Sequence, residues 1–371
     1  MQQYSDRVDL QMKKKQIIKL IIVSLIALLG VFSVFWKDVI DKNINRYLSS
    51  RNIYQSQQKL SVHFIDVGEA DAIAIKFPNG EVGLIDSGDE DDTENVMSYI
   101  YEHIINDKKS KKINYLFFTH CDNDHIGGLK RIVNHYDVQN VYRPRQYCSF
   151  EQVEDEYGYL STSEIYADAI STINEKGVNL TTVVDNMELF VGNAKIKIFS
   201  PYKKYLASND YSYFIKITYQ NQSILFTGDA SSTVENDVIA LHENELQSDY
   251  LKVAHHGSKF SSSAQFLAIV QPQVAIISVG TNMYGHPTEA VISRLQEVGA
   301  EILRTDIEGS ILVNIGQSST VFLSNYFEVS FIWKYGTLVT IVEIVCIIVI
   351  IKEVVLTIKS NKKSKKILTK V

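Results

Sequence analysis

The sequence predicts an α/β fold in which two mixed β-sheets pack face to face and helices cover their outer faces. Apolar strand-like stretches come in two blocks, one starting near residue 60 and the other near residue 195, and each block ends in amphipathic helices. This order of elements favours a sandwich of two sheets with the helices outside. A long apolar segment stands near each end of the chain, and we expect both to be transmembrane helices.

In the first block, continuous apolar runs predict strands, and a period of three to four residues predicts helices. Pro78-Asn79-Gly80 separates two of the strands and predicts a hairpin turn. Strands are expected at 60–68, 71–77, 82–86, 115–119 and 141–142, and helices at 93–105, after Gly128 and at 165–175. Residues 145–162 are acidic, rich in tyrosine and without a period, and we expect an insertion near the mouth of the site.

In the second block, a pair of strands joined by the turn Gln220-Asn221 is followed by strands and helices in alternation. Strands are expected at 195–199, 213–219, 223–227, 250–254, 274–278, 301–303 and 311–315, and helices at 234–242, 264–270 and 289–298.

The two ends of the chain predict membrane anchoring. Residues 17–36 are apolar except for Lys19, Ser24 and Ser33. This segment is long enough to cross a bilayer as a helix. Residues 333–356 are also largely apolar, although charged residues interrupt them. This segment predicts a second transmembrane span or, as the alternative, a buried core helix. Lysines flank both segments, so the positive-inside rule places both termini in the cytoplasm and the region between them outside the cell membrane. No cleavage site follows the first segment, so it is expected to stay as an anchor.

The expected organisation therefore has six parts. They are a basic cytoplasmic N-terminus at 1–16, an anchor at 17–36, a tether at 37–59, a folded domain at 60–328, a second span at 333–356 and a basic cytoplasmic tail at 357–371.

Charge and cysteine content limit the possible partners. Residues 1–19 carry a net charge of +3 and residues 352–371 carry +6, so the whole-chain charge of −6 leaves −15 for the part between. An acidic domain is a poor non-specific binder of nucleic acid, although bound metal and a local basic lip can offset its mean charge.

Cys121, Cys148 and Cys346 are too few and too scattered to predict a disulfide framework.

One polar stretch carries the strongest chemical signal. An apolar run at 115–119 ends in His120, Asp122, Asp124 and His125, and Gly127-Gly128 then opens a helix. Side chains at the tip of a strand can converge, and imidazoles alternating with carboxylates suit zinc or manganese. The alternative is a polar turn that contains two histidines by chance.

The pattern His-x-Asp-x-Asp-His-Ile-Gly-Gly at 120–128 resembles the second motif of the metallo-β-lactamase superfamily. Asp122 replaces the usual histidine, as in the hydrolase domain of ComEC-type competence proteins and in phosphorylcholine esterases. The resemblance covers about residues 60–322 and implies a four-layer αββα fold, with two divalent metal ions, zinc or manganese, at one edge between the sheets.

The resemblance also assigns roles along the chain. It implies metal ligation by His120, Asp122, Asp124, His125 and Asp229, and support of these ligands by Asp66 and Asp86. One histidine of His255-His256 is expected to bind metal and the other to face substrate. Spacing does not decide between them, and we favour His255 as the ligand. His286 is expected to bind substrate or act as an acid, and Ser258, Asn282 and Tyr284 to contact substrate.

One ligand of the superfamily pattern is missing. Most members place a further metal-binding histidine before the bridging aspartate, but residues 126–228 contain only His135, which we expect at the surface. Asn209-Asp210-Tyr211-Ser212 occupies the equivalent place. Oxygen ligands there favour manganese or a weakly held second zinc.

The expected activity is metal-assisted hydrolysis, with Asp124 orienting the nucleophile and His256 or His286 assisting the leaving group. The resemblance favours a phosphodiester in DNA or in an anionic envelope polymer of the teichoic acid or phosphorylcholine type, and it disfavours a β-lactam. DNA uptake would need a separate channel protein. The alternative of another class is a metal-poor, membrane-anchored binding or sensor module.

Overall fold

The computed structural model describes residues 59–105, 111–145, 164–316 and 320–324. The expected anchor, tether, second span, basic tails and tyrosine-rich insertion lie outside these residues, apart from the ends of the tether and the insertion. Among the helices of the described residues, none has the length and apolarity that a bilayer span requires.

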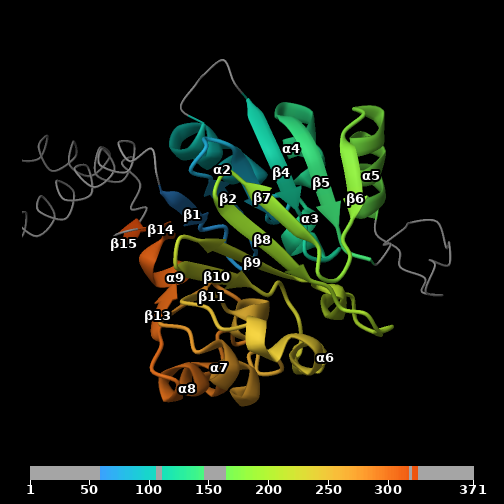
Figure 1. Cartoon of the computed structure of the whole chain (residues 1–371). Coiled ribbons are helices and arrows are strands. Elements are labelled where there is room, and N and C mark those ends of the chain that lie inside the picture. Colours follow the sequence, from blue (N-terminus) through green and yellow to red (C-terminus); the bar gives the residue numbers. More distant parts are fainter. Residues whose placement is uncertain (1–58, 106–110, 146–163, 317–319, 325–371) are drawn as a thin grey trace, which may run out of the picture. The chain divides into compact units, whose positions relative to one another are not determined.

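Two mixed sheets form the centre of the molecule (Figure 1). The first has the strand order β15-β14-β1-β2-β3-β4-β5-β6, and the second has the order β13-β12-β11-β10-β9-β8-β7. The strands of the first sheet are β1 Leu60–Phe64, β2 Ile73–Lys76, β3 Val82–Ile85, β4 Lys112–Phe117, β5 Asp137–Arg143, β6 Asn179–Thr182, β14 Ser310–Ile315 and β15 Thr320–Ser324. Those of the second are β7 Glu188–Val191, β8 Ala194–Phe199, β9 Phe214–Tyr219, β10 Gln222–Phe226, β11 Tyr250–Lys252, β12 Val274–Ile277 and β13 Glu301–Arg304.

Helices cover the outer face of each sheet, as Figure 1 shows. Those of the first half are α2 Thr93–Tyr99, η1 Ile100–Ile104, α3 Asn123–Ile126, α4 Leu129–His135 and α5 Glu164–Glu175. Those of the second are η2 Ser208–Tyr211, α6 Ser232–His242, η3 Glu243–Glu245, η4 Ala254–Gly257, α7 Ala264–Val270, α8 Glu289–Glu297 and α9 Thr305–Glu308. One apolar core lies between the sheets, and one more lies between each sheet and its helices. The four-layer prediction is confirmed.

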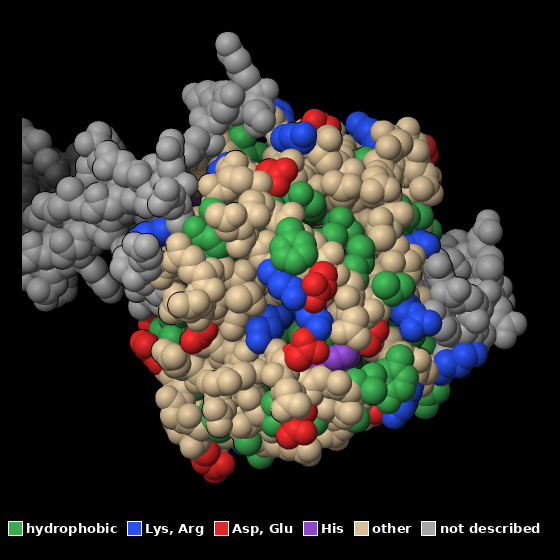
Figure 2. Space-filling view, in the orientation of Figure 1, with side chains coloured by type: hydrophobic (Ala, Val, Ile, Leu, Met, Phe, Trp, Pro, Cys, Tyr) green, Lys and Arg blue, Asp and Glu red, His purple; other side chains and the backbone are tan. Residues whose placement is uncertain are grey.

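The strands that the sequence did not predict, β6, β7 and β15, lie at sheet edges. Edge strands need less apolar surface than central ones, and β6 has no fully buried residue. On the face shown in Figure 2, basic and acidic side chains gather over the second sheet. Lys195 and Lys197 pair there with Glu188, and Lys197 also contacts Glu245.

Strand direction brings the chemically important loops to one edge. β3 and β4 are parallel, with Ile85 opposite Phe117, and β10, β11 and β12 are parallel, with Phe226 opposite Lys252. Carboxyl ends of parallel strands meet at the same edge, which is where ligands bind in open α/β sheets. The loops after these five strands build the site.

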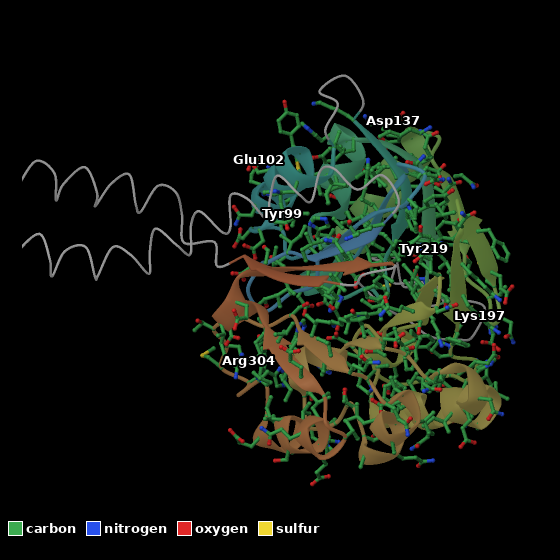
Figure 3. All side chains as sticks on the ribbon, turned by 60° about the vertical axis from the view of Figure 1, so that its left-hand side comes forward. Tyr99, Glu102, Asp137, Lys197, Tyr219 and Arg304 are labelled. Carbon is green, nitrogen blue, oxygen red and sulfur yellow. The ribbon has the colours of Figure 1, made fainter. Side chains whose placement is uncertain are left out.

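A buried histidine far from that edge makes the fold acid-sensitive. His63 of β1 is 3 % exposed, and its Nδ1 lies 3.1 Å from the Tyr99 hydroxyl. Figure 3 labels Tyr99 and Glu102 within the helical layer over this strand. Burial, assisted by the nearby His103, lowers the pKa of His63 to about 3.

We therefore expect His63 to destabilise the fold below neutral pH. The unfolded chain takes up a proton near pH 6.5 and the folded chain only near pH 3, so stability present above pH 6.5 is lost as the pH falls. The slope is about 1.4 kcal/mol per pH unit. Urea unfolding between pH 5 and 7.5 should show this slope in the difference between wild type and His63→Asn. His135→Asn, at an exposed position, is the control. Parallel curves for wild type and His63→Asn would contradict the assignment.

Candidate metal centre

The metal loop follows β4 and is held by the short helix α3. Asp122 has extended backbone and precedes the helix, and its carbonyl accepts the backbone N–H of His125 at 3.0 Å. The turn directs His120 and His125 inward, where both are fully buried, while Asp122 and Asp124 are half-buried. The loop therefore presents two imidazoles and two carboxylates on one side, as the sequence predicts.

Asp229 comes from the second sheet, after β10. Its backbone N–H donates to the Ser212 hydroxyl at 3.0 Å. Gly228 precedes it with φ of +51°, and a Cβ there would lie 2.9 Å from the side chains of Ser212 and Thr119. Only glycine fits where the two sheets approach so closely. The glycine thus brings Asp229 against the metal loop.

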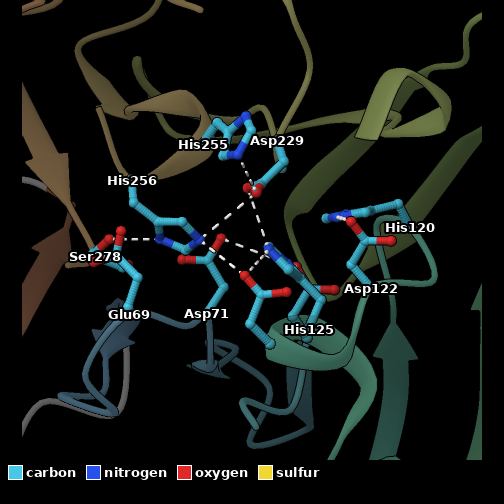
Figure 4. Close-up of polar contacts among 12 residues, drawn as sticks. Glu69, Asp71, His120, Asp122, His125, Asp229, His255, His256 and Ser278 are labelled. Atoms are coloured by element: carbon cyan, nitrogen blue, oxygen red, sulfur yellow. Dashed lines mark hydrogen bonds and ion pairs between the residues drawn. The ribbon is translucent and has the colours of Figure 1, made fainter. Parts of the chain in front are cut away.

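Four side chains converge between the sheets, and we call them the outer cluster: Asp124, His125, Asp229 and His256. One ligand atom from each lies within 4.8 Å of the others. His125 Nε2 is 3.2 Å from Asp229 Oδ1, and His256 Nε2 is 3.2 Å from Asp124 Oδ2 (Figure 4). A single cation at the centre would reach all four.

His255 and His256 point in different directions because of an unusual turn. Both have left-handed backbone, with φ of 51° and 50°. Such strain costs non-glycine residues about 1–3 kcal/mol each and occurs mostly at functional sites. The turn buries His256, whose Nδ1 donates to the Ser278 carbonyl at 2.8 Å and leaves Nε2 toward the cluster. His255 is partly exposed, with Nε2 at 3.7 Å from Asp229 Oδ2. The geometry favours His256 over the expected His255 as the ligand.

The donor atoms fit a metal ion. His120 Nε2, His125 Nε2 and Asp229 Oδ1 are buried, and none has a hydrogen-bond partner within the described residues. A buried polar atom without a partner costs free energy unless something else, such as a metal ion, satisfies it. Imidazole nitrogen and carboxylate oxygen together suit zinc, manganese or iron. These residues are therefore suited to hold a divalent metal.

Beneath the outer cluster lies a second set of charges, the inner layer, formed by Asp71, Asp86 and Lys252. Asp86 Oδ2 accepts from His125 Nδ1 and from the Thr119 hydroxyl, each at 2.8 Å, and Oδ1 accepts the Thr119 backbone N–H at 2.7 Å. A carboxylate behind an imidazole fixes its tautomer and frees Nε2 for a metal. Asp86 thus has the contact that its expected supporting role requires.

Asp66 does not reach this layer. It is exposed, and Oδ1 accepts only the backbone N–H of Gly68 within its own loop, at 3.4 Å. The neighbours Ile65 and Val67 are buried, so the side chain between them points to solvent. Asp71, at the end of the same loop, takes the inner position, with Oδ2 at 3.7 Å from His125 Nδ1. The expectation for Asp66 is corrected in favour of Asp71.

Oxygen atoms surround the other end of the metal loop. His120 Nε2 lies 3.6 Å from Asp122 Oδ2, and the Ser208 hydroxyl donates to Asp122 Oδ1 at 2.5 Å. Ser208 begins η2, the short helix that holds most of the stretch Asn209-Asp210-Tyr211-Ser212, and His135 is exposed as predicted. This half of the centre has one imidazole where the outer cluster has two.

The comparisons with known proteins agree with this geometry. Residues 65–281, more than half of the chain, match the sequence pattern of the metallo-beta-lactamase superfamily. This chain belongs to the metallo-β-lactamase superfamily. The predicted resemblance is confirmed.

Two competence proteins are among its relatives. ComE operon protein 3 of Bacillus subtilis is 30% identical over 271 residues, which are 67% of this chain and 32% of that protein. Competence protein ComA of Neisseria gonorrhoeae is 35% identical over 116 residues, 31% of this chain and 17% of that one. This chain thus spans a third or less of the length of either relative. Among solved structures, the metallo-beta-lactamase fold protein YhfI from Bacillus subtilis is similar, with a TM-score of 0.46 and 11% identity over 70% of this chain and 100% of that one.

At the rim of this metallo-β-lactamase site, His286 is held by a residue that the sequence analysis did not single out. Glu69 Oε1 accepts from His286 Nδ1 at 2.9 Å, and Oε2 accepts from the Gly280 backbone and the Asn282 amide, both at 3.1 Å. A Cβ at Gly280 would lie 2.4 Å from Gly68, so glycine permits this contact between loops. The histidine rings of 255 and 286 are 5.6 Å apart.

The three residues expected to contact substrate differ in their surroundings. Asn282 uses its amide within the loop, donating to the carbonyls of Gly280 and His286 and accepting from two backbone N–H groups. Ser258 is buried, at 3 % exposed. Tyr284 is 77 % exposed and stacks on His286, with ring centroids 5.7 Å apart. Of the three, Tyr284 is the side chain open to a ligand.

The electrostatics of the site follow from its crowding of charges. Burial alone would raise the pKa of Asp124, but His125 and His256 hold it well below its usual range. Burial would likewise lower the pKa of His256, but Asp229 and Asp124 raise it to about 9. Burial lowers the pKa of Lys252 less than Asp71 and Asp229 raise it, so the ammonium stays charged. The carboxylates are ionised and ready to ligate.

The three cysteines predict no disulfide framework, and the structure adds one bond that their spacing does not indicate, at Cys121. This buried residue of the metal loop is disulfide-bonded. Both other cysteines, Cys148 and Cys346, lie outside the described residues. Three scattered cysteines give no spacing signal from which a single bond could be predicted.

Proposed function

We propose that this chain is a membrane-anchored, extracytoplasmic, metal-dependent phosphodiesterase. The observation that carries the proposal is the outer cluster, in which His125 Nε2 and Asp229 Oδ1 are buried and have no hydrogen-bond partner among the described residues. Placement outside the cytoplasm is supported by the disulfide of Cys121, because such bonds persist in oxidising compartments. The apolar segments at 17–36 and 333–356 support anchoring.

The residues divide the work between binding and proton transfer. Asp124, His125, Asp229 and His256 would hold one divalent ion, and His120 and Asp122 would contribute to a second. Such ions, zinc or manganese, activate water and stabilise the charge that develops on phosphoryl oxygens. Asp86 fixes the tautomer of His125, and the Ser278 carbonyl fixes that of His256. Asp124 also lies at the exposed side of the cluster, where it can orient an attacking water.

The proposed substrate is a phosphodiester in DNA, with an anionic envelope polymer as the second candidate. DNA is favoured because two relatives are competence proteins. It is also favoured by exposed Tyr284 beside the site, since bases stack on aromatic side chains. The envelope polymer is favoured by the negative charge of the chain outside its basic ends. DNA uptake would in addition require a separate channel protein as a partner.

A metal-poor binding module is the proposal of another class. It requires that the cluster fails to hold metal, and its support is the departure of Asp122 and of Asn209-Asp210 from the usual histidines of the superfamily pattern. The four complete ligands of the outer cluster favour the enzyme.

Turnover measurements test the function directly. The purified chain, loaded with manganese or zinc, is expected to hydrolyse bis-(p-nitrophenyl) phosphate and to cleave single-stranded DNA. Hydrolysis of the small diester without DNA cleavage would favour the envelope polymer. Bound metal without turnover of any phosphodiester would overturn the proposal, and less than about 0.2 metal ions per chain would favour the binding module.

The Glu69–His286 pair predicts a dependence on the leaving group. Glu69 accepts the Nδ1 proton of His286, so a second proton on the ring would sit on Nε2, and this protonated ring could give it to a departing oxygen and return to the neutral form. We expect Glu69→Gln to lower kcat about 100-fold for a dinucleotide, whose alkoxide leaving group needs a proton. For bis-(p-nitrophenyl) phosphate the change should be less than about fivefold, because nitrophenolate leaves without one.

The control for this prediction is Glu175→Gln at the end of α5, which should affect neither substrate. Equal losses on both substrates would show that Glu69 only maintains the loop.

A further inference from the structure

A lysine is buried directly beneath the metal centre. Lys252 is the last residue of β11 and is 1 % exposed. Its Nζ is ion-paired with Asp71 Oδ2, donates to the Gly228 carbonyl at 3.1 Å and lies 3.7 Å from Asp229 Oδ1. A fully buried lysine is rare unless its charge is compensated. Here the compensating charges belong to the residues around the metal centre.

The inner layer could, by its composition, hold a metal ion itself. Ligand atoms of Asp71, Asp86 and His125 lie within 4.8 Å of one another. The lysine stands against this possibility, because its ammonium already occupies Asp71 Oδ2. The oxygens of Asp86 are also engaged, by Thr119 and His125. A divalent ion entering here would meet a fixed positive charge.

The same ammonium orients the carboxylate of Asp229. Oδ1 faces His125 Nε2 at 3.2 Å and Lys252 at 3.7 Å, so it is turned inward. Oδ2 faces His256 at 3.6 Å and His255 at 3.7 Å. The Thr227 hydroxyl donates to the Lys252 carbonyl at 2.8 Å, which fastens β10 to β11 next to the ligand.

We propose that Lys252 serves as the cation of the inner layer: it neutralises Asp71, holds Asp229 Oδ1 inward and keeps divalent metal out of the inner layer. Lys252 is thus a positioning residue that acts through Asp229. The inference rests on the proposed metal centre, but it concerns the number and place of bound ions, so it does not depend on the substrate. Without the lysine, Asp71 would be a buried carboxylate with no cation beside it, close to Asp86 and His125, and a divalent ion could take the place of the ammonium.

Metal counting tests this assignment. The full chain, stripped of metal, is titrated with Mn²⁺, and free ion is measured by electron paramagnetic resonance. Lys252→Met is expected to bind about one more ion per chain than wild type. The double variant Lys252→Met/Asp71→Asn removes both charges and should return to the wild-type number. Lys197→Met, which removes an ion-paired lysine of the same sheet away from the site, should leave the number unchanged.

Three outcomes of the titration would overturn the assignment. They are an unchanged number of ions in Lys252→Met, an extra ion that persists in the double variant, and an extra ion in Lys197→Met. If Lys252→Met is unfolded without metal, refolding by Mn²⁺ supports the assignment, and failure to refold overturns it. Failure of the proposed function would appear separately, as wild-type protein that binds metal but hydrolyses no phosphodiester.

Discussion

Replacing Asp124 by alanine is expected to reduce phosphodiester hydrolysis at least about 1,000-fold. The loss of one group that stabilises developing charge costs about 100- to 1,000-fold in other enzymes, and Asp124 is also placed to ligate metal and orient water. Its Oδ2 lies 3.2 Å from His256 Nε2 and 3.7 Å from His125 Nε2. The measurement is kcat/KM for bis-(p-nitrophenyl) phosphate at saturating metal.

The matched control is Asp168→Ala. Asp168 is 60 % exposed on α5 and pairs with Lys130 at the surface, where an ion pair contributes little. It should keep wild-type activity. If Asp124→Ala keeps more than a tenth of the activity and the metal content of wild type, Asp124 neither ligates the metal nor orients the attacking water.

The adjacent histidines predict an equally large and more discriminating contrast. His256→Ala should weaken binding of the tighter metal ion by at least about 100-fold, the upper end of what loss of a mere supporting group costs. His255→Ala should leave the affinity within about threefold of wild type, because His255 lies outside the outer cluster and is partly exposed. Isothermal titration with zinc against a competing chelator measures both.

Each variant is the control for the other, since both remove an imidazole from the same strained turn. The reverse result, with metal lost in His255→Ala and kept in His256→Ala, would restore the ligand that the sequence analysis favoured.

The sequence was sufficient for the layers and for the metal loop. Both have strong local signals: buried strands such as β4 end in polar residues of metal-binding type, and helices such as α5 show a clear period. The sequence was not sufficient where the direction of a side chain decides which residue binds the metal. His255 and His256 both have left-handed backbone, which turns His256 inward and His255 outward. The spacing of residues in the sequence does not indicate such a turn.

The inner layer was missed for a different reason. A lysine within a strand predicts a solvent-facing position, yet Lys252 is buried because two carboxylates from distant parts of the chain surround it. Glu69 was missed because its partner His286 is 217 residues away. Compensation of charge between distant loops becomes visible only when the sheets are packed.

The outer cluster draws equally on the two halves of the chain. Asp124 and His125 follow a strand of the first sheet, whereas Asp229 and His256 follow strands of the second. The core between the sheets is likewise shared, from Phe64 and Phe117 on one side to Tyr213 and Phe226 on the other. A chain severed between β6 and β7 would leave two fragments, each with half a ligand set and an uncovered apolar sheet. Neither fragment could act as a catalyst by itself, and activity would return only where both fragments reassociate around their common core.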